Sequence, residues 1–350
     1  MVNLKSIFFE KFRGLQGLKL EDLGRINLLV GINNSGKTSV LEGLSVYCNP
    51  VDLREWWLTS SQREREDRFT RTSVIDSLRW LFPQASTLKA RNEAADNSEH
   101  GTLIISSDGE FPISSLLATY EVVEELRPPR RVDPGRSSEG NDLELTRGLE
   151  LTVKINSTLW TDNSEQLELD VNIPEDDSEE LLKAFEFQIW ENDITIRFRR
   201  FTGYSVPIEL VTTTSHRSES QQFRLLTEAR FQDFKSDVIS LLQSIDNNIL
   251  DIEILADPGS VTTRPRFNIY LSHKKLGLAP LGSFGDGIRR LLHIALKLPR
   301  ARNGILLIDE LESTIHTEAL QLTYSWLSKW CQAMDVQLFA TTHSLEAVDA

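Results

Sequence analysis

One short segment constrains the fold of this chain more than any other. Gly31–Thr38 reads GINNSGKT and matches the pattern G-x-x-x-x-G-K-[ST]. The apolar run Ile26–Val30 precedes it and predicts a strand covered on both faces, while Lys37–Tyr47 follows it with apolar side chains at helical spacing. A strand, a glycine-rich loop and a helix in this order predict that backbone N–H groups of the loop surround a phosphate group.

The loop predicts a binding site for ATP together with Mg²⁺. We expect Lys37 to contact the β- and γ-phosphates and to contribute to catalysis, and Thr38 to ligate the metal ion. A glycine- and asparagine-rich turn before an ordinary helix is the alternative, and the complete motif between a strand and a helix makes it the weaker one. The other loop residues expected to bind the nucleotide are Gly31, Asn33, Asn34, Ser35, Gly36 and Ser39.

A second segment, far along the chain, carries two acids at the end of an apolar run. Ile305–Glu312 reads ILLIDELE and predicts a buried strand that ends at Asp309 and Glu310. We expect Asp309 to hold Mg²⁺, directly or through water, and Glu310 to act as general base toward the attacking water. Acids after a strand also occur as helix caps, so this interpretation depends on the phosphate loop upstream.

Two further segments resemble motifs of the ABC ATPases. Leu281–Gly287 reads LGSFGDG, and its Ser283 and Gly285 match the serine and central glycine of the ABC signature, which binds the nucleotide of the opposite subunit in ABC dimers. Phe339–Ser344 reads FATTHS, and His343 resembles the switch histidine that contacts the γ-phosphate. A flexible turn and a structural histidine are the alternatives, and the order of the motifs along the chain favours the ABC assignment.

With the opening segment included, the motifs resemble the RecF/SMC/OLD branch of the ABC ATPases, close to AAA-15/AAA-21-type bacterial ATPases of phage-defence operons. Phe9–Leu15 reads FEKFRGL and resembles the first strand and turn of that branch, which implies that Arg13 lies near the nucleotide. Glu312–His316 corresponds to the D-loop at the dimer interface. The Q-loop glutamine stays open between three candidates, Gln62, Gln221 and Gln222.

The resemblance implies an α/β fold, a P-loop NTPase with an ABC-type core whose mixed or parallel sheet is flanked by helices. The matching motifs lie near both ends of the chain, and the residues between them resemble the family only weakly. This predicts a core split by an α+β insertion. We expect residues 1–50 and 215–350 to form the two parts of the core and residues 51–214 to form the insertion. The sequence contains no long heptad run that would support a coiled-coil arm of the SMC kind.

Apolar periodicity predicts the remaining elements. It indicates helices at Gln222–Leu242, from Gly285 onward, and at Thr317–Cys331. Strands that alternate with helices imply a parallel sheet with crossover connections. Further short strands are expected at residues 102–106, 149–155, 166–171, 194–201, 249–255, 267–271 and 336–340.

Charge and composition limit the choice of partners. A net charge of −14 argues against a surface that binds nucleic acid without specificity. Arginines cluster at residues 63–71, 127–131 and 197–200, where a solvated or salt-bridged face is favoured over a phosphate-binding patch. The sequence has no apolar run of membrane-spanning length, so we expect no membrane contact. Cys48 and Cys331 lack metal-ligand spacing and are expected to be reduced thiols in the cytoplasm.

We therefore expect an ATP-hydrolysing switch that works as a homodimer or higher oligomer, with two ATP molecules between the subunits. The insertion is expected to recognise a partner, either DNA or another nucleic acid, or an effector protein such as a nuclease or toxin. A RecF-like DNA-binding repair ATPase and a non-catalytic scaffold held together by ATP remain as alternatives. Glu310 and His343 argue against the scaffold, because a scaffold needs no hydrolytic base.

Overall fold

The computed structural model describes residues 3–66, 73–84, 99–127, 143–157, 182–191, 205–256 and 267–343. The strands predicted at residues 166–171 and 194–201 lie outside the described residues. The chain forms two compact units. Unit 1 contains Met1–Asn3, Leu23–Leu41 and Val206–Ala350, and unit 2 contains Leu4–Asp22 and Glu42–Ser205.

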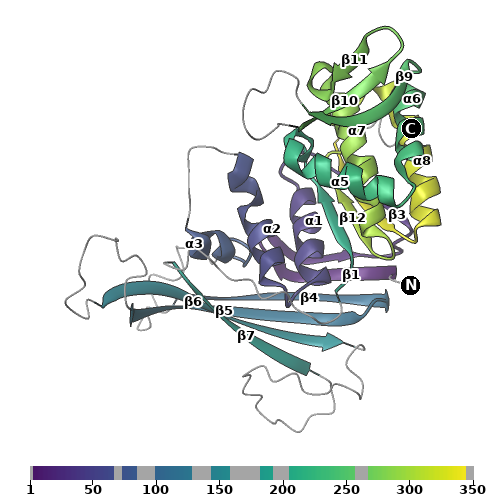
Figure 1. Cartoon of the computed structure of the whole chain (residues 1–350). Helices are drawn as coiled ribbons and strands as arrows, with labels where there is room; N and C mark the ends of the chain where they lie inside the picture. The colour runs from purple at the N-terminus through teal and green to yellow at the C-terminus, as the bar shows by residue number, and fades with distance from the viewer. Residues whose placement is uncertain are drawn as a thin grey trace, which may run out of the picture. The chain divides into compact units, whose positions relative to one another are not determined.

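Unit 1 is built on a four-stranded parallel sheet (Figure 1). Its strands lie in the order β3 (Ile26–Val30), β13 (Gln337–Thr342), β12 (Ile305–Ile308) and β8 (Ile208–Val211). Every residue of β12 and β13 is buried, as expected for apolar strands covered on both faces. Because the strands are parallel, their carboxyl ends meet at one edge of the sheet. The strands predicted at 26–30 and 305–308 are confirmed, but the cover predicted on both faces of Ile26–Val30 is wrong: β3 is the edge strand of the sheet, is half-buried, and leaves Val30 51% exposed. Strand β8 was missed.

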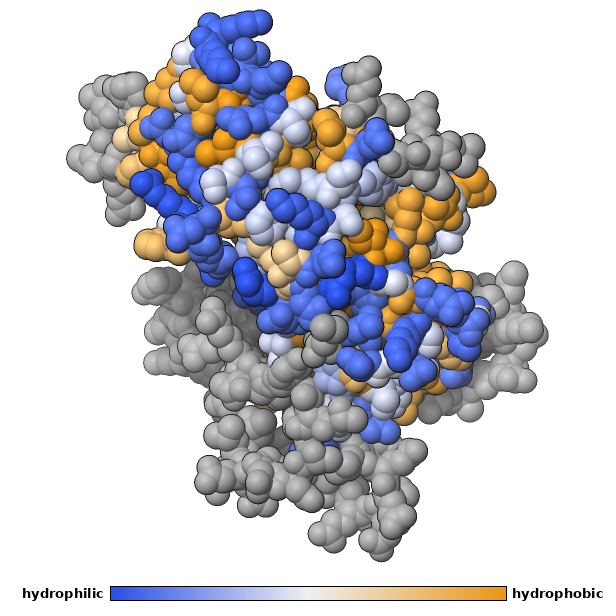
Figure 2. Space-filling model, turned by 90° about the vertical axis from the view of Figure 1, so that its right-hand side faces the viewer, coloured by the Kyte–Doolittle hydropathy of each residue, from blue (hydrophilic) through white to orange (hydrophobic). Residues whose placement is uncertain are grey.

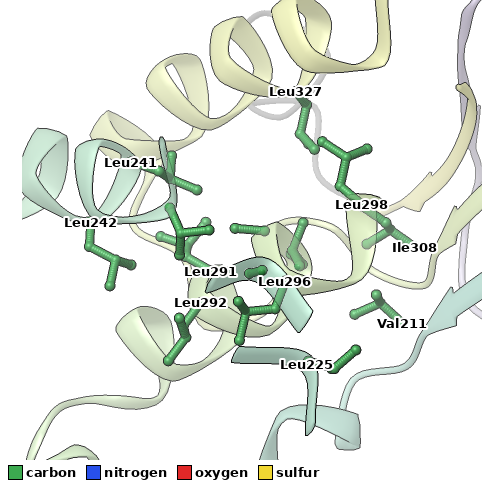
Figure 3. Close-up of a cluster of buried hydrophobic side chains, with 14 of the residues drawn as sticks. Val211, Leu225, Leu241, Leu242, Leu291, Leu292, Leu296, Leu298, Ile308 and Leu327 are labelled. Carbon is green, nitrogen blue, oxygen red and sulfur yellow. The ribbon is translucent and has the colours of Figure 1, made fainter. Parts of the chain in front are cut away.

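Four long helices complete the core of unit 1, namely α5 (Glu219–Phe231), α6 (Lys235–Ile245), α7 (Asp286–Lys297) and α8 (Thr317–Ala333). Figure 3 shows leucines of α6 and α7 pointing toward one another and toward the strands. Each fully buried leucine contributes about 1.5–3 kcal/mol of transfer free energy. The labelled residues are Val211, Leu225, Leu241, Leu242, Leu291, Leu292, Leu296, Leu298, Ile308 and Leu327.

The single helix predicted over Gln222–Leu242 is wrong. The chain breaks between α5 and α6 at Asp233, whose φ of 54° lies in the left-handed region and ends a helix. Phe234 is buried there, with its ring centroid 4.8 Å from that of Trp330 in an edge-to-face arrangement. The contact with α8 therefore outweighs the local helical periodicity.

A small antiparallel sheet precedes α7. Its order is β11 (Gly277–Pro280), β10 (Phe267–His273) and β9 (Ile249–Ala256), and it confirms the strands predicted at 249–255 and 267–271. A short 3₁₀ helix, η3 (Leu281–Ser283), joins β11 to α7. This sheet therefore delivers the predicted signature segment to the start of α7.

Unit 2 contains a six-stranded sheet, and helices α2 (Leu53–Glu66) and α3 (Val74–Arg79) lie over one of its faces (Figure 1). Trp56 of α2 stacks on Phe82, and Phe82 meets Tyr120 of the sheet edge-to-face at 4.7 Å. The strand order is β2 (Leu15–Leu20), β1 (Asn3–Phe12), β4 (His100–Glu110), β5 (Ile113–Arg127), β6 (Glu144–Ser157) and β7 (Leu182–Trp190).

The division into units differs from the predicted division at residues 50/51 and 214/215. Strands β1 and β2 belong to unit 2, because β1 is hydrogen-bonded to β4 in the six-stranded sheet. The boundary falls between Leu41 and Glu42, inside helix α1 (Lys37–Cys48), and unit 1 resumes at Val206. Nothing in the local sequence indicates which sheet an apolar N-terminal strand will join.

One member of the arginine clusters is described with its side chain. Arg127 lies over the Trp190 ring at 4.1 Å and pairs with Glu125 at 3.7 Å, which fits the salt-bridged alternative for this residue. Among the described residues, no helix combines the length and apolarity needed to cross a membrane. Figure 2 shows hydrophilic side chains over much of one face, with groups of hydrophobic residues between them.

His293 of α7 makes the stability of unit 1 sensitive to acid. Its side chain is fully buried, neither ring nitrogen has a hydrogen-bond partner among the described residues, and burial lowers its pKa from 6.5 to about 3. Lys297, His216 and Arg290 also lower this pKa. Below pH 6.5 the His293 imidazole is protonated in the unfolded chain, but in the folded chain it stays neutral down to about pH 3. The stability that comes from the neutral His293 is therefore fully present above pH 6.5 and is lost as the pH falls toward 3.

We expect the His293→Leu variant to lose this dependence. From pH 6.5 to 5 the wild-type free energy of unfolding should fall by about 2 kcal/mol more than that of the variant. Urea unfolding at both pH values measures the difference. Equal pH dependence in the two proteins would mean that His293 is protonated in the folded state.

Candidate nucleotide-binding site

The strand register of unit 1 brings the predicted motifs to one edge of the sheet. Val30, at the end of β3, is paired with Thr342 of β13. Ile308, at the end of β12, is paired with Ala340 of β13 on one side and with Val211 of β8 on the other. The phosphate loop, the two acids and the polar end of β13 therefore follow neighbouring strands.

The loop Gly31–Thr38 has the backbone conformation that its glycines permit. Gly36 has a φ of 91°, and a Cβ on Gly31 would lie 2.7 Å from the Ser35 hydroxyl oxygen. Asn34 also adopts a positive φ, of 64°. Helix α1 begins at Lys37, directly after Gly36, so its first N–H groups, which lack intrahelical partners, face the loop.

The Lys37 side chain folds back over this loop. Its ammonium group donates to the carbonyl oxygens of Gly31 at 2.7 Å and Ile32 at 2.8 Å. Phosphate oxygens are stronger acceptors than neutral carbonyl oxygens, because they carry full charge. The ammonium group is thus held at the loop, where a phosphate could replace its present partners.

The two residues predicted to hold Mg²⁺ lie together. The Thr38 hydroxyl is 3.2 Å from each carboxylate oxygen of Asp309. A hydroxyl and a carboxylate are the hard oxygen donors that Mg²⁺ prefers, and it commonly uses few protein ligands beside water and substrate phosphates. The described residues contain no cluster of three or more His, Cys, Asp or Glu side chains for a metal. The donor set therefore fits a Mg²⁺ ion that is bound together with a nucleotide.

Thr341 of β13 supports both acids, and the sequence analysis missed it. Its hydroxyl donates to Asp309 Oδ1 at 2.7 Å and accepts the Glu310 backbone N–H at 2.7 Å. Glu310 has a φ of 48°, in the left-handed region where a residue with a long side chain is strained. A polar residue at the end of an apolar strand was the available signal, and the sequence analysis used it only for His343.

Arg290 of α7 is the second residue that the sequence analysis missed. Its side chain is fully buried, and its guanidinium donates to the carbonyl oxygens of Thr212 at 2.9 Å, Asp309 at 2.6 Å and Glu310 at 2.8 Å. Burial lowers the pKa of Arg290 to about 10, and the carboxylates of Asp309, Glu310 and Glu312 oppose this shift, so the group stays charged at neutral pH. An arginine beside an apolar helix face carries no sequence signal of such a role.

His343 follows β13 and is held by Glu312. Its backbone N–H donates to Glu312 Oε1 at 2.9 Å, and its ring Nδ1 lies 3.2 Å from the same oxygen. The ring is 45% exposed, which leaves it accessible to a ligand. Its contact with a γ-phosphate stays a prediction.

The predicted signature residues lie apart from this cluster. Ser283 and Gly285 are exposed, at the end of η3 and at the N-cap of α7. No hydrogen bond or ion pair among the described residues joins either of them to the phosphate loop. Arg13 belongs to unit 2, where its guanidinium pairs with Glu42 at 2.8 Å, and its contact with a nucleotide stays a prediction.

The Q-loop candidates differ in their surroundings. Gln222 is buried and its side chain donates to the His216 carbonyl oxygen at 2.6 Å, so it bonds the segment that follows β8 to helix α5. Gln62 lies in α2 of unit 2. The side chain of Gln221 lies outside the described residues. The geometry of unit 1 favours none of the three as a nucleotide ligand.

A parallel sheet with a glycine-rich phosphate loop after one strand and an Asp–Glu pair after a neighbouring strand defines a P-loop nucleotide-binding domain. The family described as “AAA domain, putative AbiEii toxin, Type IV TA system” matches residues 26–349. The chain belongs to this family. The resemblance to AAA-21-type ATPases is thereby confirmed, and so is an α/β fold with a parallel sheet flanked by helices.

Two curated proteins of Methanocaldococcus jannaschii match shorter stretches. Uncharacterized protein MJECL11 is 43% identical over 65 residues, which cover 19% of this chain and 57% of that protein. Uncharacterized protein MJECL10 is 46% identical over 44 residues, which cover 13% of this chain and 20% of that protein. The chain thus spans little more than half of one relative and a fifth of the other.

Similar solved structures include SMC heads. The SMC head bound to the C-terminal winged-helix domain of ScpA has 8% identity and a TM-score of 0.46, with 99% of this chain and 91% of that chain covered. The SMC head domain from Thermotoga maritima has 11% identity and a TM-score of 0.40, with 100% and 92% covered. At these scores, neither residue roles nor partners transfer to this chain.

Proposed function

We propose that this protein binds and hydrolyses ATP and acts as a nucleotide-driven ABC-type switch. The observation that carries the proposal is the meeting of Thr38 and Asp309 at 3.2 Å, with Glu310 next in the chain and Lys37 one residue before Thr38. A positive group, metal-binding oxygens and a carboxylate base are the parts that phosphoryl transfer to water requires.

Each residue has a distinct part in this proposal. Thr38 and Asp309 would hold Mg²⁺, which offsets phosphate charge when it is bound. Lys37 contacts the β- and γ-phosphates. Glu310 accepts the proton of the water that attacks the γ-phosphorus, and ADP leaves with the electron pair of the broken P–O bond. His343, accessible at the same edge, contacts the γ-phosphate.

The site is completed by a second copy of the chain. Ser283 and Gly285 are exposed and make no hydrogen bond or ion pair with the phosphate loop of their own chain among the described residues. In the proposed dimer each signature faces the ATP held by the other copy. Two ATP molecules are then enclosed between two subunits, and hydrolysis reopens them.

The proposed setting is anti-phage defence or DNA maintenance in the cytoplasm, with an effector protein, a nuclease or toxin, supplied by another chain. The family description, which names a toxin and a toxin–antitoxin system, supports the defence setting. A RecF-like repair ATPase that binds DNA shares the same site and differs in its partner. The non-catalytic scaffold is less favoured, because Glu310 is held in a strained conformation by two separate groups.

Mixing two inactive variants tests the composite site. Ser283→Arg places a bulky charge where the partner's γ-phosphate must pack, and Lys37→Ala removes the phosphate contact, so each homodimer should be inactive. A heterodimer keeps one intact site, made of the loop of one chain and the signature of the other. A one-to-one mixture should therefore recover about a quarter of wild-type ATPase activity.

Two affinity tags, one on each variant, establish that heterodimers are present. Recovery well above the sum of the separate variants supports a site shared between subunits. No recovery in a preparation proved to contain heterodimers would favour a site completed within one chain.

A further inference from the structure

Helix α7 begins at the exposed signature segment, and its Arg290 contacts the backbone of Asp309 and Glu310. Gly285 caps its N-terminus, and Arg290 lies within its second turn. This helix packs in the core of unit 1 through Leu291, Leu292 and Leu296 (Figure 3). Arg290 is thereby anchored on a rigid element, while the acids that it contacts lie on a turn.

The contacts of Arg290 join the ends of two strands. All three of its described hydrogen bonds go to backbone carbonyl oxygens, one after β8 and two after β12. A buried guanidinium is costly to desolvate, and a nonpolar side chain would fill the same space at lower cost. The planar guanidinium of Arg290, however, donates its hydrogen bonds in fixed directions. It therefore holds the ends of β8 and β12 in place relative to α7.

The guanidinium of Arg290 and the hydroxyl of Thr341 each form a hydrogen bond with the backbone of Glu310. Arg290 holds the Glu310 carbonyl oxygen, and the Thr341 hydroxyl holds its N–H. Both bonds maintain the positive φ of 48°, a backbone conformation that is strained for a residue of this kind. The backbone conformation in turn sets the direction of the Glu310 carboxylate.

A second close approach joins α7 to the same turn. A Cβ on Gly287 would lie 2.7 Å from the carbonyl oxygen of Thr314, which itself has a φ of 65°. Only a glycine lets the helix approach this carbonyl so closely. The turn after β12 therefore contacts α7 at two points.

We propose that Arg290 is a positioning residue that sets the place of the base Glu310 from the signature helix of the same chain. The inference rests on the proposed hydrolysis, since it assigns a group that acts through Glu310. Among the described residues Arg290 makes no hydrogen bond to the phosphate loop, and it contacts Asp309 only at the backbone carbonyl oxygen, so the proposed role concerns the chemical step through Glu310.

Arg290→Lys tests the proposal, because an ammonium keeps the charge but cannot supply the planar fork. We expect kcat for ATP to fall about 10- to 100-fold, the size of effect that follows displacement of a catalytic group by about 1 Å. The Kd for ATP should change less than about threefold. Arg289→Lys is the matched control: Arg289 is the preceding residue, its side-chain hydrogen bond is to Asp286, and kcat should stay near the wild-type value.

Combining Arg290→Lys with Glu310→Gln distinguishes a positioning role of Arg290 from a general effect on stability. In the Glu310→Gln chain the base is absent, so Arg290→Lys should cause no further loss in the residual rate. If Glu310→Gln itself hydrolyses ATP at the wild-type rate, the proposed function fails, whatever Arg290 does. If hydrolysis depends on Glu310 but Arg290→Lys keeps the wild-type kcat, only this inference fails.

Folding is checked by thermal denaturation of each variant. Should Arg290→Lys fail to fold, Arg290→Gln, which retains an N–H donor on a shorter side chain without the charge, is measured in the same way. Failure of both variants to fold, or an equal loss in the Glu310→Gln background, would show that Arg290 is structural and would overturn the proposal.

Discussion

Lys37→Ala is expected to abolish ATP binding and hydrolysis together. The ammonium group lies at the phosphate loop, bonded to the carbonyl oxygens of Gly31 and Ile32, and no other cationic side chain is described within hydrogen-bond distance of that loop. A hydrogen bond to a charged group contributes about 1.5–3 kcal/mol. Loss of contacts to two phosphates should therefore weaken ATP binding by about 10²- to 10⁴-fold.

Titration calorimetry with MgATP and a phosphate-release assay measure the two effects. Lys235→Ala is the matched control, because Lys235 lies in the same unit but at the start of α6, where it pairs with Asp251. Thermal denaturation shows whether the loop variant remains folded, since Lys37 also bonds its own loop. A folded Lys37→Ala protein that hydrolyses ATP at the wild-type rate would contradict the phosphate-loop assignment.

Glu310→Gln is expected to separate the two activities that Lys37→Ala removes together. Glutamine keeps the length and shape of the side chain and leaves the bonds of the Glu310 backbone to Thr341 and Arg290 in place. It cannot accept the proton of the attacking water. Hydrolysis should fall by about 10²- to 10⁴-fold, the usual contribution of a general base, while ATP binding persists.

The distinguishing measurement is the nucleotide that stays with the protein after gel filtration. Glu310→Gln should retain ATP, whereas the wild-type protein should retain ADP or no nucleotide. Glu228→Gln makes the same chemical change in α5, where Glu228 pairs with Arg224, and should behave as wild type. Loss of ATP binding in Glu310→Gln would favour a metal-binding or structural role for this carboxylate.

The parts of the site that the sequence predicted are those carried by contiguous segments. The phosphate loop, the strand before it and the strand at 305–308 were located because their residues are local and their apolar runs are short and uninterrupted. The meeting of Thr38 with Asp309 was expected because both motifs assign a ligand to the same Mg²⁺ ion, and the structure brings them together because parallel strands end at one edge. The contributions of Arg290 and Thr341 could not be predicted, because each depends on a backbone group that is distant in the sequence.

By itself, the sequence determined the class of the protein, because the motifs at Gly31–Thr38 and Ile305–Glu312 need only local strand, loop and helix patterns. Tertiary structure alone decided which strands share a sheet. Strand β1 joins β4 in unit 2, and β8 lies beside β12 in unit 1. It also decided the break at Asp233, where burial of Phe234 outweighs helical propensity. Such choices depend on hydrogen bonds and packing between distant segments, which local periodicity does not encode.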